Sequence, residues 1–146
     1  MLLAVTRPPP TTGTDEARRT LLRQEVGRFR RGESRRVFDA SVHVGVLAGP
    51  RTGFVARAQD VPALDAALKV DVVCALLEDS PDSWRTAWLV RPGTTERHDL
   101  DLQWLSAVRT AFGVVDRALD GCYVVTRAGW RDLLTDEARS WARLRL

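Results

Sequence analysis

The hydrophobic and polar positions of this chain follow two periods, which predict a mixture of helices and strands. From Thr14 to Gly32, apolar residues recur every three or four positions, the spacing of one helix face. This apolar stripe consists of Ala17, Leu21, Leu22, Val26 and Phe29. Thr14 is a suitable cap, and Asp15 and Glu16 suit a first turn because carboxylates stabilise a helix N-terminus. We therefore expect a first helix over 14–32.

The segment 37–58 changes to a period of two, which is typical of strands. Apolar residues at 42, 44 and 46 alternate with Ser41, His43 and Gly45, and the run Gly49-Pro50-Arg51 then turns the chain toward 53–58. The pattern predicts a β-hairpin. Because His43 lies opposite the valines, we expect it at the surface or at a sheet edge.

Residues 62–78 are apolar on nearly all sides, which favours a buried helix. Pro62 suits its first turn, and Asp65 lies one turn before Lys69, at the spacing of a helical ion pair. The three valines at 70, 72 and 73 leave open a helix that breaks into a short strand.

A second alternating run begins at Trp84 and is stopped by Pro92-Gly93, and it places Trp84, Trp88 and Val90 on one buried face of a strand. A helix follows from Asp99. Its apolar residues are Leu102, Trp104, Leu105, Ala107, Val108, Ala111, Phe112 and Val115. A further strand is expected over 122–126 after the turn at Asp120-Gly121.

The predicted order is therefore α-β-β-α-β-α-β, an α/β fold that borders on α+β. We expect a β-hairpin followed by a right-handed parallel β-α-β unit in one mixed sheet. A chain of 146 residues suits a single domain, assigned to 14–146. Residues 1–13 are expected to be irregular, because the three prolines at 8–10 cannot continue a helix.

The C-terminal segment 135–146 fits two structures. Thr135-Asp136-Glu137 followed by arginines has the polarity of a helix. Residues 142, 144 and 146 are apolar and alternate with Trp141, Arg143 and Arg145, which predicts a strand hairpinned to the strand before it. Both interpretations stay open at this stage.

Charge and aromatic residues are distributed unevenly. Residues 1–36 hold nine arginines and four acids, whereas residues 37–146 hold 13 basic and 15 acidic residues, and all five tryptophans lie in the second half. Lys69 is the one lysine, and Ile and Asn are absent, which is typical of a high-GC bacterial genome. The arginine excess therefore has two interpretations, codon usage and a selected anion site.

Cysteine usage and hydropathy predict a soluble cytoplasmic protein with no membrane partner. Cys74 and Cys122 each lie in an apolar run, which is typical of reduced core cysteines. No apolar run approaches the length of a membrane span, and Met1 to Val5 is shorter than the apolar region of a signal peptide.

Motifs for catalysis are scarce. The chain has no Gly-rich phosphate loop, no paired cysteines at zinc spacing and no His-Glu-x-x-His, so no cofactor is expected. An alternative function is that of a hydrolase, with His98, Asp99 and Asp101 as an acid-base or metal cluster. The alternative is that the two aspartates complement a helix dipole while His98 is solvated.

The element order is similar to that of the JAB/MPN metalloprotease-like domains over about two thirds of the chain. In those domains a strand ends in a His-x-His-Pro-type motif before a helix that carries a metal-binding aspartate. Here the segment reads Trp88-Leu89-Val90-Arg91-Pro92-Gly93, so the proline, the glycine and a later aspartate match but the histidines are absent. The resemblance implies a hydrolase fold with an inactive site.

We expect the protein to bind another macromolecule without catalysing a reaction. The first candidate surface is a Trp/Arg surface near the C-terminus that would bind a protein or a second copy of the chain. Its residues are Trp130, Arg131, Arg139, Trp141 and Arg143. The alternative is phosphate contact with a nucleic acid. The residues for that contact are Arg30, Arg31, Arg35 and Arg36.

Overall fold

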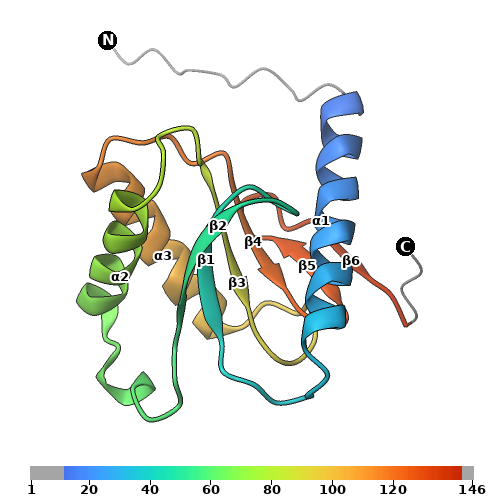
Figure 1. The fold of residues 1–146 in the computed structure, drawn as a ribbon, viewed down its shortest axis with the longest axis horizontal. Coiled ribbons are helices and arrows are strands. Elements are labelled where there is room, and N and C mark those ends of the chain that lie inside the picture. The colour runs from blue at the N-terminus through green and yellow to red at the C-terminus, as the bar shows by residue number, and fades with distance from the viewer. Residues whose placement is uncertain (1–11, 143–146) are drawn as a thin grey trace.

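The computed structural model describes residues 12–142 of the chain. This part contains a mixed sheet of six strands (Figure 1). Its order is β2-β1-β3-β4-β5-β6. The strands are β1 (Ser41–Gly45), β2 (Arg51–Val55), β3 (Thr86–Val90), β4 (Gly121–Val125), β5 (Gly129–Asp132) and β6 (Ala138–Ser140). Only β3 and β4 are parallel, and the other neighbours are antiparallel.

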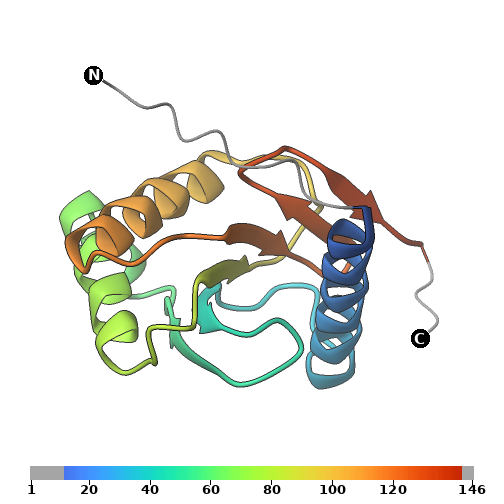
Figure 2. The ribbon, with the colours of Figure 1, turned by 90° about the horizontal axis from the view of Figure 1, so that it is seen from above.

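Helices cover both faces of the sheet. α1 (Thr12–Gly32) lies on one face, and α2 (Ala66–Glu78) and α3 (Asp99–Val114) lie side by side on the other (Figure 2). A short 3-10 helix, η1 (Val61–Ala63), precedes α2. The predicted mixed α/β fold is confirmed, including the hairpin β1-β2 and the parallel unit β3-α3-β4.

The sheet separates two apolar cores. Successive side chains of a strand point to opposite faces of the sheet, so each central strand contributes residues to both cores. In β3, Ala87 and Leu89 face α2 and α3, whereas Trp88 and Val90 face α1. In β4, Val124 lies on the first side and Tyr123 and Val125 lie on the second. Burial on both faces explains why every residue of β4 is buried.

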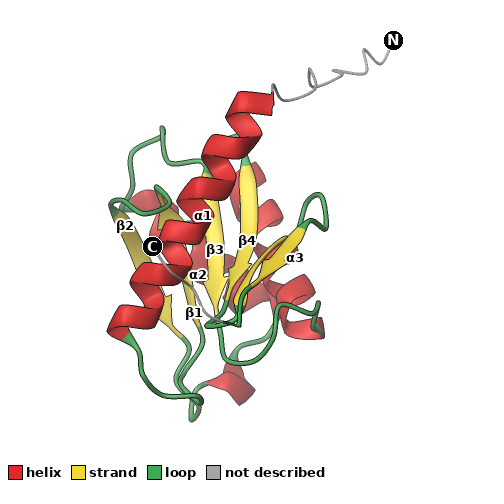
Figure 3. Ribbon diagram, turned by 90° about the vertical axis from the view of Figure 1, so that its right-hand side faces the viewer, coloured by secondary structure: helices red, strands yellow, loops and turns green. Residues whose placement is uncertain are grey.

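α1 crosses one face of the sheet (Figure 3), and charged side chains hold it there. At one end, Arg18 bonds Asp132 at 2.8 Å and Arg19 bonds Glu137 at 2.6 Å, which ties the helix to β5 and the turn before β6. Further along the helix, Glu25 is bound by residues of the β1-β2 hairpin. Its carboxylate accepts hydrogen bonds from the Arg51 guanidinium and from the backbone N–H of residue 48, at 2.7 and 3.0 Å. These contacts set the path of α1 across the sheet, from β5 and the turn before β6 to the β1-β2 hairpin.

Two element predictions need correction. The helix expected over 62–78 is η1 followed by α2, and its Val70–Val73 segment stays helical, so the strand alternative is wrong. Asp65 caps α2 by accepting from the N–H of Leu68 at 2.8 Å, whereas the Lys69 ammonium donates to the Leu64 carbonyl and to Gln103. Capping α2 and pairing with Lys69 compete for the short Asp65 side chain. Capping is favoured because it satisfies a backbone N–H of the first helical turn, which an ion pair does not.

Trp84 and Trp88 do not share a face. Trp84 precedes β3 and packs against the core under α2 and α3, whereas Trp88 belongs to the core under α1. The two-residue period holds only inside the strand, and Trp84 lies outside it. Trp104 of α3 is buried as expected.

In the C-terminal segment, residues 138–140 form the strand β6 and residues 135–142 contain no helix, so the helix alternative is wrong, whereas most of the alternating run 141–146 lies outside the described residues. β6 is hairpinned to β5, a four-residue strand absent from the predicted order, and not to β4. Residues 143–146, including Arg143, and residues 1–11 lie outside the described part of the chain.

His43 is largely buried, contrary to the expectation of a surface position. Its ring stacks on Trp88 with a centroid separation of 5.6 Å, and the Ser41 hydroxyl lies 2.8 Å from its Nε2. Burial, followed by the nearby Arg51, lowers the pKa of His43 to about 4. The side of β1 opposite the valines faces α1, which the hairpin pattern alone does not indicate.

Neither Cys74 nor Cys122 forms a disulfide. Burial raises the pKa of the Cys122 thiol to about 12, whereas Cys74 is half-buried. None of the helices in residues 12–142 is long and apolar enough to span a membrane.

Candidate binding surface

A cavity of about 400 Å³ lies between the N-terminal half of α1 and the β5-β6 hairpin. α1 contributes polar residues, and the hairpin contributes aromatic rings and one arginine. The lining consists of Glu16, Arg19, Thr20, Arg23, Trp130, Arg139 and Trp141. Three arginines against one glutamate give this cavity, here called the α1–β6 groove, a positive lining.

The two tryptophans of the groove differ in exposure. Trp130 is 0% exposed and belongs to the core under α1, so the expectation that it lies on the surface is wrong. Trp141 is half-buried, and the Arg23 guanidinium lies 5.8 Å from the centre of its ring. Trp141 therefore supplies the accessible aromatic surface, and Trp130 the floor beneath it.

Among residues 12–142, the groove lies beside an open edge of the sheet, because β6 is the last strand in the sheet order. The N–H of Asp132 donates to the carbonyl of Glu137, and the N–H of Trp141 donates to the carbonyl of Ala128. In an antiparallel ladder, hydrogen-bonded pairs alternate with pairs whose N–H and C=O groups point away from the neighbouring strand. Residues 137 and 141 belong to hydrogen-bonded pairs, so residues 138 and 140 belong to the other kind. Ala138 and Ser140 therefore direct their backbone groups away from β5, toward the open edge.

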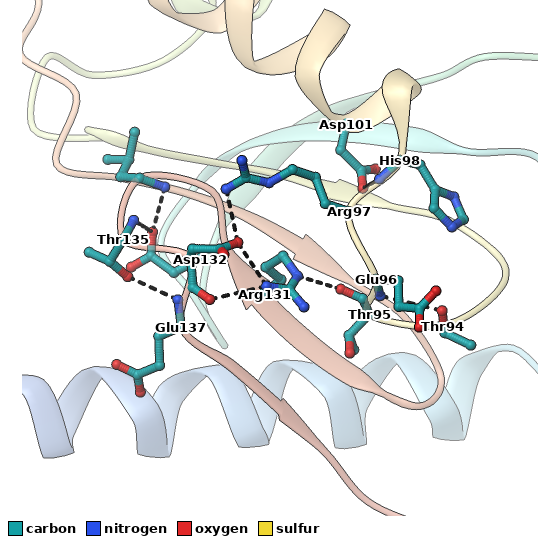
Figure 4. Close-up of polar contacts among 12 residues, drawn as sticks. Thr94, Thr95, Glu96, Arg97, His98, Asp101, Arg131, Asp132, Thr135 and Glu137 are labelled. Carbon is teal, nitrogen blue, oxygen red and sulfur yellow. Dashed lines mark hydrogen bonds and ion pairs between the residues drawn. The ribbon is translucent and has the colours of Figure 1, made fainter.

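Arg131 points away from this groove into a polar network (Figure 4). Its guanidinium donates to the Thr95 carbonyl at 2.6 Å and to the Asp136 carboxylate at 2.8 Å. Arg97 bonds the same carboxylate at 2.9 Å. Arg131 thus joins β5 to the loop before α3 and to the turn before β6. This role is structural and differs from the contact role predicted from the sequence.

The arginines at the C-terminal end of α1 form a separate group. Arg30 and Arg31 lie in the last turn, where positive charge complements the helix dipole. Arg35 is paired with Glu33 at 2.7 Å, and Arg36 is exposed. The groove lies near residues 16–23 of α1, so the two predicted surfaces are not continuous.

His98, Asp99 and Asp101 begin α3 but do not form a cluster. Asp101 is fully buried and accepts bonds from Arg91 and from the backbone N–H of His98, the latter at 2.9 Å. His98 and Asp99 are exposed. In residues 12–142 no three His, Cys, Asp or Glu side chains lie close enough to hold a metal ion.

Arg91 fills the place that the JAB/MPN comparison assigns to metal-binding histidines. It is 2% exposed, directly follows β3, and bonds Asp101 through Nε at 2.6 Å and Nη2 at 2.8 Å. Its remaining N–H groups donate to the carbonyls of Pro92, Thr94 and Glu96. An internal cation therefore holds the aspartate, and the geometry does not support the hydrolase alternative.

Ser41 and His43 resemble a nucleophile and its base, but the arrangement lacks a third group. In the described residues, His43 Nδ1 has no hydrogen-bond partner to orient the imidazole. A pKa of about 4 also makes this imidazole a weak base near neutral pH.

Sequence reasoning did not place Glu16, Arg19, Thr20 or Arg23 in the groove. Arg19 and Arg23 are one helical turn apart on the polar side of the first predicted helix, which was a usable signal. Their proximity to Trp141 depends on how α1 crosses the sheet, and no local pattern specifies that crossing.

Comparisons with protein-family models, curated protein sequences and solved structures gave no match. The function is therefore inferred from the residues of this chain.

Proposed function

We propose that this protein is a non-catalytic protein-binding domain that accepts an acidic, extended segment of a partner protein along β6. The observation that carries the proposal is the α1–β6 groove beside an open strand edge. A strand added to Ala138 and Ser140 would gain backbone hydrogen bonds, and its alternate side chains would enter the groove.

Charge favours an acidic segment. Arg139 is exposed in the middle of β6, and Arg19 and Arg23 approach the groove from α1. Arg19 is engaged by Glu137, so Arg139 is the main positive charge facing an incoming strand. Trp141 offers an aromatic surface for one apolar side chain between the acidic ones.

A second copy of the chain is a less suitable occupant. Two β6 strands paired antiparallel about their centres would place Arg139 opposite Arg139, and directly opposed like charges destabilise a sheet. The predicted self-association stays a prediction, which light scattering of the purified protein tests. We also propose a cytoplasmic location, supported by the two free cysteines.

A displayed library of random peptides tests the proposal without a known partner. We expect enriched peptides to carry an acidic, an apolar and a second acidic residue at positions i, i+2 and i+4, because alternate residues of a strand face the same side. Arg139→Glu should weaken their binding about tenfold or more, the effect of one charge-assisted contact.

Arg57→Glu is the matched control, because Arg57 is also exposed but follows β2 at the far edge of the sheet. It should leave peptide affinity unchanged. Enrichment of peptides without acidic residues, or equal losses in the two variants, would contradict the proposal.

A further inference from the structure

Lys69, the one lysine of the chain, is a buried cation without a carboxylate partner. It is 8% exposed on α2, and its Nζ donates to the Leu64 carbonyl at 2.9 Å and to Gln103 Oε1 at 3.1 Å. The same nitrogen lies 5.8 Å from the centre of the Trp104 ring. Both acceptors are neutral, and an ammonium has three N–H donors, so within the described residues one donor lacks an acceptor and no carboxylate balances the positive charge.

Two adjoining cavities meet at this ammonium. A groove of about 790 Å³ lies between α2 and α3, and a smaller, more enclosed cavity of about 200 Å³ lies beside it. Leu64, Lys69 and Gln103, the three residues of the hydrogen-bonded group, line both. The remaining lining of the smaller cavity is apolar and includes Leu100 and Trp104.

A buried charge is costly unless an opposite charge or several hydrogen bonds compensate it. We propose that the double cavity binds a small monocarboxylic acid with an apolar chain. The ligand's carboxylate accepts the third N–H of Lys69, and its chain fills the apolar lining. A single negative charge balances the single positive one, since neither lining contains an arginine. Asp65 at the wall of the larger groove disfavours a dianion.

This site is independent of the α1–β6 groove, because α2 and α3 cover the face of the sheet opposite α1 (Figure 2). Sequence reasoning expected Asp65 to pair with Lys69. Because Asp65 caps α2 instead, the ammonium has no carboxylate partner among the described residues.

Titration of the ¹⁵N-labelled protein with octanoate, followed by NMR, tests the proposal. We expect saturable shifts of the Trp104 indole N–H and of α2 and α3 amides, and at least about tenfold weaker binding of 1-octanol, which lacks the charge. Lys69→Met should weaken octanoate binding by a similar factor and leave octanol binding intact.

Lys69→Met preserves the length of the side chain and removes an uncompensated charge, so its unfolding midpoint should rise and a loss of binding cannot be attributed to misfolding. Arg109→Met, at an exposed position of α3 outside both linings, is the control and should bind octanoate as the wild type does. Equal binding of octanoate and octanol, unchanged octanoate binding by Lys69→Met, or no shifts would overturn the proposal.

Discussion

Arg91 and Asp101 form a two-pronged ion pair in the interior, with Nε to Oδ1 at 2.6 Å and Nη2 to Oδ2 at 2.8 Å. The pair joins the end of β3 to the first turn of α3 and fixes the intervening loop through three carbonyl contacts of Arg91. Its role is structural.

Asp101→Asn should destabilise the protein by about 3 kcal/mol, because it leaves the Arg91 charge buried and unpaired. Urea unfolding monitored by circular dichroism measures this loss. The double variant Arg91→Met/Asp101→Leu should recover most of the loss, since no buried charge remains. A cost below about 1 kcal/mol for Asp101→Asn would show that the pair does not support the loop.

Acid should destabilise the protein through His43. Its folded pKa of about 4 lies below the unfolded value of about 6.5, so the unfolded state takes up the proton first as pH falls. The contribution of His43 is full above about pH 6.5 and is lost progressively toward pH 4, by at most about 3 kcal/mol.

Unfolding free energies of the wild type and of His43→Leu, measured between pH 4 and 8, test this prediction. Between pH 4 and 8, the unfolding free energy of His43→Leu should lack the pH-dependent contribution of His43. His98→Gln, at an exposed position, should retain that contribution. Parallel pH profiles for the wild type and His43→Leu would contradict the burial of this imidazole.

Glu25 should matter more for the docking of α1 than Arg19. Glu25 is 2% exposed and bonds both Arg51 and the backbone of the hairpin, so Glu25→Ala should cost about 3 kcal/mol and reduce the hydrogen-exchange protection of α1. Arg19→Ala removes a solvent-screened pair and should cost much less than Glu25→Ala. Equal costs in the two variants would be inconsistent with anchoring through the hairpin.

The arginines at the end of α1 are expected to stabilise the helix and not to bind nucleic acid. Replacing Arg30, Arg31, Arg35 and Arg36 by serine should lower stability slightly, since Arg30 and Arg31 lie in the last turn of α1, and should leave retention on a DNA column unchanged at physiological salt. A marked, salt-dependent loss of DNA retention would instead favour the nucleic-acid alternative.

Local patterns were sufficient for most of the fold. The helix at the N-terminus, the hairpin β1-β2 and the unit β3-α3-β4 were all predictable, because each has at least one clear period bounded by turn residues. β5 was missed because four residues, Gly129 to Asp132, are too short to display a period.

The site was predictable only in part. Arg139 and Trp141 line the groove as part of the predicted Trp/Arg surface, but Trp130 forms its floor and Arg131 points away from it. Alternation indicates which residues share a face of a strand, but it does not show that α1 covers that face. That information lies in long-range pairs such as Arg18 with Asp132.

The most direct measurement of the proposed function compares Ala138→Pro with Ala138→Val in binding an acidic peptide selected from the library. Proline removes the outward N–H of β6 without removing a bond to β5, whereas valine retains that N–H. We predict that peptide affinity, measured by calorimetry, falls about tenfold or more in Ala138→Pro and stays close to the wild-type value in Ala138→Val. Equal affinity of the two variants, with both folded, would contradict binding along β6.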